Sequence, residues 1–477
     1  MKRALPFAVS TVALCVLGAC GGGSGNPGGG GGGGTGAATH FSVTAPSAAT
    51  AGTAFNITVT AMDASNATVA RYSGTVHFTS SDGQAVLPAD STLTSGTKSF
   101  PVTLTSVGAE TITATDTVTA AITGTSNSVQ VTGSAALHGF QATGDMGDER
   151  VGHSATLLAN GKVLVAGGVD MTNNPLATAE LYDPATGTFT ATGSMISART
   201  AHAAVLLANG PAASNGKVLL IGNSGANNAE LYDPATGTFT ATGTPVGPIS
   251  ELTATLLANG KVLVAGGPRP AAALYDPATN SFTLTGTMTT SRPEATATLL
   301  KDGTVLIAGG FDSMLSPIIT AELYNPATGT FAATGSMTVA RSGYAATLLN
   351  SGKVLVTGGT DINGNLTSSA ELFDPATGSF SAANSMKAPH NIHTATLLND
   401  GTVLVAGGLL NPNPPGDGSS VAEIFDPTTN TFTATGSLLT GRYFHTATNL
   451  GNGDVLVTGG LSKSTPSVIL KSAELFK

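Results

Sequence analysis

Short stretches of alternating apolar and polar residues fill the chain between residues 38 and 133. They read HFSVTAP, AFNITVTAMD, GTVHFTSS, TKSFPVTLTS, AETITATD and SNSVQVT, with Gly, Ser, Asp and Asn between them. None has the spacing of an amphipathic helix. Period-two patterning with a turn signal every ten or so residues is typical of a β-sandwich. We therefore predict a small all-β module over residues 38–133.

A second pattern occupies residues 138–477 and repeats along them. In its first unit we predict four strands, at residues 153–158, 162–168, 179–184 and 187–193. The second strand is apolar at consecutive positions, as expected of a strand buried on both faces. The turns NGK and DPATGT carry hairpin signals. Four-stranded units repeated about every 50 residues are typical of a β-propeller.

The units are counted by an apolar run that ends in Gly-Gly. Six such pairs occur, and a degenerate seventh has Gly222 followed by Asn223; the pairs are Gly167-Gly168, Gly266-Gly267, Gly309-Gly310, Gly358-Gly359, Gly407-Gly408 and Gly459-Gly460. We predict seven blades, with six or eight as alternatives. The last unit stops at AELFK, without a fourth strand. Residues 139–146 match the missing half, so we predict that they close the last blade.

The Gly-Gly pairs and the aromatic residues that follow them resemble the kelch repeat, with Phe in place of the kelch Trp. The resemblance spans residues 138–477 and implies a kelch-type propeller. Kelch-like propellers include the copper-radical galactose and glyoxal oxidases, whose cofactor needs a Cys cross-linked to a Tyr. No cysteine follows Cys20, so we expect neither that cofactor nor any other. Residues 38–133 resemble bacterial Ig-like modules, which act as spacers or as adhesive domains.

The N-terminus has the three-part pattern of an export signal. A basic start is followed by a short apolar run and small residues, and the run is too short for a comfortable membrane span. Leu17-Gly18-Ala19-Cys20 resembles the bacterial lipoprotein signal, which implies a signal over 1–19, a lipid on Cys20 and a cell-envelope location at the outer membrane or cell surface. An ordinary cleaved signal is the alternative. The Gly-rich residues up to 37 predict a flexible linker.

Composition narrows the choice of partner. The formal net charge is −9 and only 10% of residues are charged, which argues against nucleic acid, because nucleic acids select clustered Lys and Arg. We expect a monomer, held at a membrane through its lipid, that binds a protein or a glycan. No paired carboxylates, nucleophile elbow or phosphate loop appears.

Arg and Glu recur at fixed positions in the repeats. Where one repeat has Ile249 in place of Arg, it also has Ala273 in place of Glu, so we predict that the two residues pair as structural ion pairs. We predict Glu322 with Arg341 as one such pair. The sets are Arg150, Arg199, Arg292, Arg341 and Arg442, and Glu180, Glu230, Glu322, Glu371, Glu423 and Glu474.

The loops between strands two and three, and between strands four and one, vary most and should share one face. Loops on a rigid scaffold are the usual place of binding residues. The candidates on this face are His153, His202, His393, His445, Asp170, Asp312 and Asp361. Metal binding by the histidines is the alternative to structural hydrogen bonds, and we expect no metal. Calcium or sugar contact is the alternative to turn capping by the aspartates.

We therefore predict an all-β, non-catalytic envelope protein: a lipid anchor, an Ig-like module and a kelch-type propeller with a binding face. The alternative function is a carbohydrate-active enzyme that acts on sialic acid or another glycan at the mouth of the propeller channel.

Overall fold

The computed structural model describes residues 36–477, except for residues 51–52, 107, 133–138, 209–213, 223–228, 248–249, 411–415 and 465–466. The predicted signal, Cys20 and nearly all of the linker therefore lie outside the described residues and stay predictions. The chain divides into two compact units, residues 1–136 and 137–477. Over the described part of the chain, no helix is long and apolar enough to cross a membrane.

Unit 1 contains three small sheets. Their strands are β1 (His40–Thr44), β3 (Ala54–Met62) and β6 (Thr97–Thr103) in the first sheet; β2 (Ala48–Thr50), β10 (Val129–Thr132) and β7 (Gly108–Glu110) in the second; and β5 (Ser91–Thr92), β4 (Thr75–Ser80), β8 (Ile112–Asp116) and β9 (Thr123–Thr125) in the third. All pairs are antiparallel except β10 with β2. The predicted strands occur, and β2, β5 and β9 are additional short ones.

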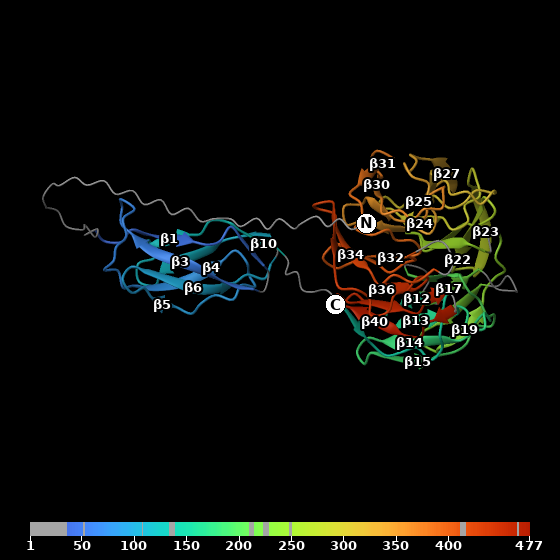
Figure 1. Ribbon diagram of the computed structural model, residues 1–477, viewed down its shortest axis with the longest axis horizontal. Helices are drawn as coiled ribbons and strands as arrows, with labels where there is room; N and C mark the ends of the chain where they lie inside the picture. Colours follow the sequence, from blue (N-terminus) through green and yellow to red (C-terminus); the bar gives the residue numbers. More distant parts are fainter. Residues whose placement is uncertain are drawn as a thin grey trace, which may run out of the picture. The chain divides into compact units, whose positions relative to one another are not determined.

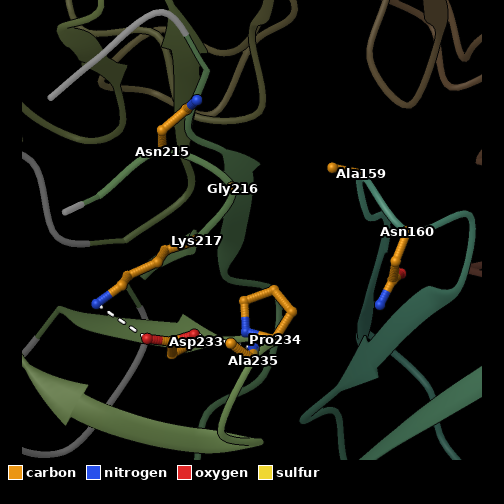
Figure 2. Close-up of a pocket in the computed structure, with 8 residues that line it drawn as sticks. All are labelled: Ala159, Asn160, Asn215, Gly216, Lys217, Asp233, Pro234 and Ala235. Carbon is orange, nitrogen blue, oxygen red and sulfur yellow. Dashed lines mark hydrogen bonds and ion pairs between the residues drawn. The ribbon is translucent and has the colours of Figure 1, made fainter. Parts of the chain in front are cut away.

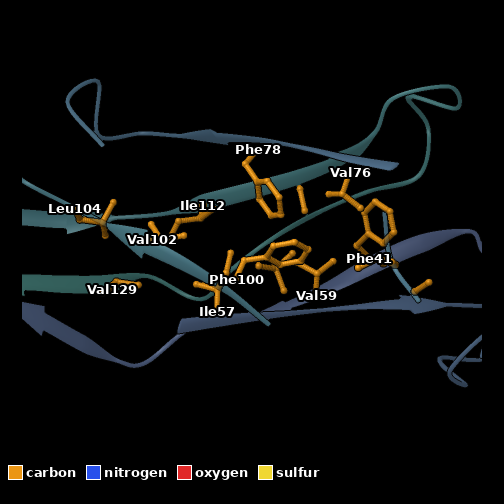
Figure 3. Close-up of a cluster of buried hydrophobic side chains, with 14 of the residues drawn as sticks. Phe41, Ile57, Val59, Val76, Phe78, Phe100, Val102, Leu104, Ile112 and Val129 are labelled. Carbon is orange, nitrogen blue, oxygen red and sulfur yellow. The ribbon is translucent and has the colours of Figure 1, made fainter. Parts of the chain in front are cut away.

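The core of unit 1 follows the alternation in the sequence. Along β3 every second residue is buried, including Ile57 and Val59, and β4 buries Val76 and Phe78. Figure 3 shows these side chains directed toward one another from separate strands. The rings of Phe78 and Phe100 meet edge to face, with centroids 4.7 Å apart. The period-two pattern thus specifies which face of each strand packs inward.

Unit 2 contains seven four-stranded antiparallel sheets among its described residues. In chain order they are β12 (Ser154–Leu157), β13 (Val163–Ala166), β14 (Ala179–Asp183) and β15 (Thr188–Ala191); β16 (Ala203–Leu206), β17 (Val218–Ile221), β18 (Glu230–Asp233) and β19 (Thr238–Ala241); β20 (Leu252–Leu256), β21 (Val262–Gly266), β22 (Ala271–Asp276) and β23 (Ser281–Thr287); β24 (Thr296–Leu299), β25 (Val305–Ala308), β26 (Ala321–Asn325) and β27 (Thr330–Ala333); β28 (Ala345–Leu348), β29 (Val354–Thr357), β30 (Ala370–Asp374) and β31 (Ser379–Ala383); β32 (Thr394–Leu397), β33 (Val403–Ala406), β34 (Ala422–Asp426) and β35 (Thr431–Ala434); and β36 (Thr446–Asn449), β37 (Val455–Thr458), β40 (Ala473–Phe476) and β11 (Phe140–Ala142). A two-stranded ribbon, β38 (Leu461–Ser464) and β39 (Ser467–Ile469), follows β37.

The sheets form a closed ring. The second strand of every sheet is buried along its length, as in β13 and β29, because neighbouring sheets cover both of its faces. First strands of consecutive sheets contact one another, and β36 contacts β12. Figure 1 shows the result, with the C-terminal strands in red beside the green sheet of β12–β15.

The ring closes through the two ends of unit 2, as the sequence predicted. β11 pairs with β40 in the register Phe140↔Phe476, Gln141↔Leu475 and Ala142↔Glu474. The rings of Phe140 and Phe476 lie 5.1 Å apart, centroid to centroid. The chain therefore completes its last sheet with a strand that precedes the first one.

A repeated contact explains why the sequence copies the motif DPATGTFTATG. Gly193 N donates to the carbonyl O of Gly237 in the next sheet at 2.9 Å, and the hydroxyls of Thr192 and Tyr232 lie 2.9 Å apart. Thr143 repeats this contact with Tyr182 at 2.8 Å. The fourth strands of the first five sheets and the strand that closes the ring are thus attached to the turn of the following sheet.

Candidate ligand-binding site

An arginine precedes the first strand in five of the seven sheets, and its side chain is fully buried in all five. In each case an Nη atom contacts Oε1 of a glutamate on the third strand of the same sheet. The N···O distances are 3.0 Å for Arg150–Glu180, 2.5 Å for Arg199–Glu230, 3.0 Å for Arg292–Glu322, 2.8 Å for Arg341–Glu371 and 2.5 Å for Arg442–Glu474.

Each pair fixes two loops. Arg341 Nη1 donates to the carbonyl O of Gly358 at 2.8 Å and of Ser369 at 3.1 Å, which are the two ends of the loop between strands two and three. Glu371 accepts from the backbone N–H of Thr338 at 2.7 Å, in the loop that leads to the first strand. Charge-assisted bonds of this kind are stronger than neutral ones. The pairs therefore hold the loops on one face of the ring.

The predicted pairing of Glu322 with Arg341 is wrong. Glu322 contacts Arg292, which precedes the first strand of its own sheet. The first and third strands of one sheet flank the same second strand, so their ends meet. Arg341 belongs to the next sheet.

Two repeats depart from the arginine–glutamate pattern. In the sixth sheet His390 replaces arginine, with Nδ1 2.6 Å from the carbonyl O of Gly407 and Nε2 3.4 Å from Oε1 of Glu423. Burial raises the pKa of Glu423, but hydrogen bonds from His390 and from two backbone N–H groups outweigh it, so that the pKa is lowered. In the third sheet Ala273 is buried, and Ile249 lies outside the described residues.

The four candidate histidines join neighbouring sheets. Their Nε2 atoms contact hydroxyl groups of the preceding sheet: His153 with Thr446 at 3.1 Å and Thr458 at 3.0 Å, His202 with Ser154 at 2.9 Å, His393 with Thr357 at 2.9 Å, and His445 with Thr394 at 3.0 Å. The first glycine of the Gly-Gly pair provides the space, since a Cβ at Gly407 would lie 2.6 Å from Cε1 of His445.

Burial keeps these rings neutral. It lowers the pKa of His153, His202 and His445 to about 3, and that of His393 well below its usual value. Across the described ranges, no group of three or more His, Cys, Asp or Glu side chains could hold a metal ion. The observed contacts are those of inter-sheet hydrogen bonds.

The three candidate aspartates fold their own loops. Asp361 Oδ1 accepts from the backbone N–H of Asn363 at 2.8 Å and of Asn365 at 2.9 Å. Asp170 and Asp312 accept from the residues two and four positions later in the same way. These bonds lower the pKa of Asp170, with the hydroxyl of Thr172 contributing most. The aspartates are therefore turn caps at the variable loops.

A cavity of about 510 Å³ opens on the same face, where the first strands begin. Its lining includes His153, His393 and His445, but not His202. It also includes six residues that share one repeat position, immediately before the first strand or its histidine: Gly152, Ala201, Glu294, Gly343, Ile392 and Phe444. Glu251 holds that position in the third sheet. We call these seven residues the mouth ring.

All seven residues of the mouth ring have a left-handed backbone, with φ between 46° and 68°. This conformation is natural for Gly152 and Gly343, but uncommon for a β-branched residue such as Ile392. Ile392 N donates to the carbonyl O of Gly343 at 2.7 Å, and Ala201 N donates to Gly152 at 2.7 Å, which links successive sheets. These hydrogen bonds between sheets hold the non-glycine residues of the mouth ring in a strained conformation. Strained backbone conformations are concentrated at functional sites.

The mouth ring has an acidic part and an apolar part. Glu251 and Glu294 occupy adjacent sheets, while Ile392 and Phe444 occupy the sixth and seventh. Glu294 is exposed at the rim, yet the cavity wall removes part of its hydration. That burial, followed by the negative charge of Glu251, raises the pKa of Glu294. Phe444 is 48% exposed despite its size.

The mouth ring is absent from the residues predicted from the sequence, and its neighbouring carboxyl groups Glu251 and Glu294 correct the expectation of no paired carboxylates. Its signal is variation between repeats at one position beside constant neighbours: Gly, Ala, Glu, Glu, Gly, Ile and Phe occur where the flanking Arg and His are largely kept. Sequence alone gives no indication of the left-handed backbone at Ile392 and Phe444, because neither residue favours it.

A second hollow, of about 480 Å³, lies at the opposite ends of the strands (Figure 2). It is formed by repeated turn residues whose polar groups already have partners. Lys217 Nζ lies 3.1 Å from Asp233 Oδ2, and Asp233 Oδ1 accepts from Ala235 N at 2.9 Å. An equivalent groove recurs around Lys353 and Asp374. We attribute it to the spacing of the sheets.

The kelch motif family matches residues 150–196. Among solved structures, the chain is similar to a fungal alcohol oxidase of the AA5 family in complex with copper, with a TM-score of 0.59 and 18% sequence identity over 72% of this chain and 76% of that one. No curated protein sequence matches the chain.

At this level of identity the similarity shows the fold: unit 2 is an all-β propeller of the kelch, galactose-oxidase-like type. The copper belongs to the similar protein. This chain has no cysteine after Cys20, and the side chains that the structure describes form no cluster of three metal-binding groups. The residues present do not fit that copper site.

Proposed function

We propose that this protein is a non-catalytic, lipid-anchored envelope protein whose propeller binds a protein or glycan at the mouth ring. In this proposal the seven closed sheets are seven kelch blades, and unit 1 is an Ig-like spacer between anchor and propeller. Cys20 would carry the lipid at the outer membrane or cell surface.

The observation that carries the proposal is the contrast between the mouth ring and its surroundings. Buried arginines, glutamates and histidines repeat with few changes and bond to one another, so they account for the scaffold. Around the same cavity, one repeat position carries Gly, Ala, Glu, Ile or Phe. Its left-handed backbone is costly for all of these residues except Gly. A scaffold has no need for that variety, whereas a recognition site does.

The variable loops support a macromolecular partner. The turn caps Asp170, Asp312 and Asp361 are followed by apolar side chains that lie open to solvent. Met171 is 46% exposed, Met314 80% and Ile362 64%. A single exposed apolar side chain is common on protein surfaces, but these three lie in loops on the face that carries the mouth ring and add apolar contact area there. Residues 411–415 of another variable loop lie outside the described residues.

Replacing Ile392 and Phe444 together by glycine should abolish binding and leave the fold intact. Glycine already occupies the equivalent position at Gly152 and Gly343, and it adopts φ near 60° without strain. We expect unit 2 to keep its stability within about 1 kcal/mol, because relief of strain offsets the added backbone entropy. Binding should be measured on glycan and protein arrays with the purified protein.

The matched control is Lys217→Ala in the groove of Figure 2, on the opposite face. It should leave every array signal unchanged. If the control lowers the signals as much as the double glycine variant does, or if the glycine variant binds normally, the mouth ring is not the binding site.

The second candidate is a glycan-cleaving enzyme, and the pair Glu251 and Glu294 favours it. Two neighbouring carboxyl groups, one with a raised pKa, are what glycoside hydrolysis requires. A sialic acid carboxylate would need an arginine to bind it, but the five arginines that precede the first strands are fully buried in ion pairs. Release of new reducing ends from an array-positive glycan, lost in Glu294→Gln, would establish this function and replace the binding role.

A further inference from the structure

We infer that the ligand of the mouth ring carries a protonated amine or guanidinium group joined to an apolar, preferably aromatic, body. This inference deepens the proposed binding function and depends on it. It rests on the charges, the apolar side chains and an unpartnered buried acceptor at the cavity.

The charged groups at the cavity are of one sign. Glu294 is the sole ionised side chain in the lining, which contains no Lys or Arg. The nearby arginines Arg292 and Arg341 are fully buried and neutralised by Glu322 and Glu371. The lining histidines are neutral because burial lowers the pKa of each. Glu251, in the neighbouring sheet, adds a second negative charge at the rim.

A buried acceptor points to a hydrogen-bond donor on the ligand. Asn391 lines the cavity and is 7% exposed, and its Oδ1 has no hydrogen-bond partner. Its carbonyl lies against Gly343, since a Cβ at Gly343 would stand 2.1 Å from that oxygen. The oxygen has almost no accessible surface, so a ligand donor reaches it only when the Asn391 side chain turns toward the cavity, and an unpartnered buried acceptor costs free energy until then. A primary ammonium or a guanidinium offers N–H donors, whereas a quaternary ammonium does not.

Aromatic and apolar side chains complete the site. Phe311 also lines the cavity, and its N–H donates to the carbonyl O of Pro293 at 3.0 Å, so its backbone lies beside that of Glu294 in the same lining. A cation at Glu294 would thus have an aromatic ring next to it, a favourable arrangement for cation–π attraction. Ile392 and Phe444 lie two and three sheets further around the ring. They would cover the apolar body of the ligand.

The order around the ring explains how one ligand uses both parts. The acidic groups lie in the third and fourth sheets, with Phe311 in the fourth, the unpartnered acceptor lies in the sixth, and Ile392 and Phe444 lie in the sixth and seventh. Gly343 stands between them, and the Asn391 side chain takes the place that a Cβ would need there. A cavity of about 510 Å³ is within the usual size for small-molecule sites. It would admit an amine with one aromatic group, or a side chain of a protein partner.

The test uses the full chain and three probes in calorimetric titrations: 2-(2-naphthyl)ethylamine, the neutral alcohol 2-(2-naphthyl)ethanol, and ethylamine. We expect the naphthyl amine to bind at least tenfold more tightly than either of the others. Glu294→Gln should weaken the amine about tenfold and leave the alcohol unchanged. Phe444→Gly should weaken both naphthyl compounds. Thermal midpoints of the variants verify that they are folded.

Two outcomes would overturn the inference: equal affinity for amine and alcohol, or an amine affinity that Glu294→Gln does not alter. The proposed function is tested separately. If an array ligand that depends on Ile392 and Phe444 is neutral or anionic, the propeller is still a binding module and only the inference on ligand class fails. If no array ligand and no probe depends on the mouth ring, the proposed function fails as well.

Discussion

Lowering the pH from 7 to 5 should destabilise unit 2 by several kcal/mol, although pH 5 is still about one unit above the pKa of an ordinary aspartate. The cause is a set of four neutral histidines that join the sheets, of which His153, His393 and His445 are buried and His202 is partly buried. In urea titrations at the two pH values, the unfolding transition of unit 2 should move to lower urea at pH 5. Unit 1 has no buried histidine among its described residues, so its transition should stay in place.

The sign follows from proton binding. Unfolded histidine has a pKa of about 6.5, whereas in the folded ring the pKa of His153, His202 and His445 is about 3. Between these values the unfolded chain binds more protons, so stability is complete above about pH 6.5 and falls as the pH approaches 3. At pH 5 each histidine costs about 2 kcal/mol, and four cost up to about 8 kcal/mol. Glu294 acts in the opposite sense, because its pKa is raised, but it is a single rim residue.

The chain itself offers the control substitution. Tyr344 takes the histidine position in the fifth sheet, where its hydroxyl contacts Thr296 at 3.1 Å and donates to the carbonyl O of Ala308. His202→Tyr should therefore be tolerated at pH 7. It should remove about a quarter of the pH dependence, because one of the four protonation sites is lost. A pH profile that His202→Tyr leaves unaltered would show that the histidines are not its source.

Replacing Arg341 by leucine should lower the free energy of unfolding of unit 2 by about 3–5 kcal/mol. The substitution leaves Glu371 buried without its cation, 2.8 Å from where Nη2 had been, and it removes the donors to Gly358 and Ser369. Both variable loops of that sheet would lose their anchor. Chemical denaturation of the single variant measures the effect.

The double variant Arg341→Leu with Glu371→Leu separates the ion pair from packing. We expect it to be more stable than Arg341→Leu alone by about 1–3 kcal/mol, since no charge is left buried. The third sheet already buries Ala273 at the glutamate position. The control is Lys353→Ala, which breaks an exposed ion pair with Asp374 in the same sheet and should cost under about 1 kcal/mol. Losses that simply add in the double variant would refute the pairing.

Repetition made much of the fold predictable. One strand pattern recurs in every unit, so an error in one copy is corrected by the others, and the incomplete last copy identified residues 139–146 as the partner of AELF. The simultaneous loss of Arg and Glu in one repeat indicated their contact. It did not identify the partner correctly, because choosing Arg292 over Arg341 for Glu322 requires knowing which strand ends meet.

The candidate site was harder to predict. The sequence favoured the histidines and aspartates because such side chains have reactive groups, but the structure uses their hydrogen bonds to join sheets and to cap turns. Ile392 and Phe444 attracted no notice, since an isolated apolar residue is read as core. Their position on an exposed ring depends on a left-handed backbone and on hydrogen bonds between sheets, which no local pattern encodes.

The pairing of β11 with β40 also has a consequence for the order of events during biosynthesis. The ribosome makes β40 more than 300 residues after β11, so an open strand edge must wait for that length of chain to emerge before its partner exists. Until then the nascent chain presents unpaired edges and near-identical copies of one strand, which favour mispairing between neighbours or between chains. Slow synthesis of the segment that contains β40, or its loss through a premature stop codon, should therefore produce aggregation.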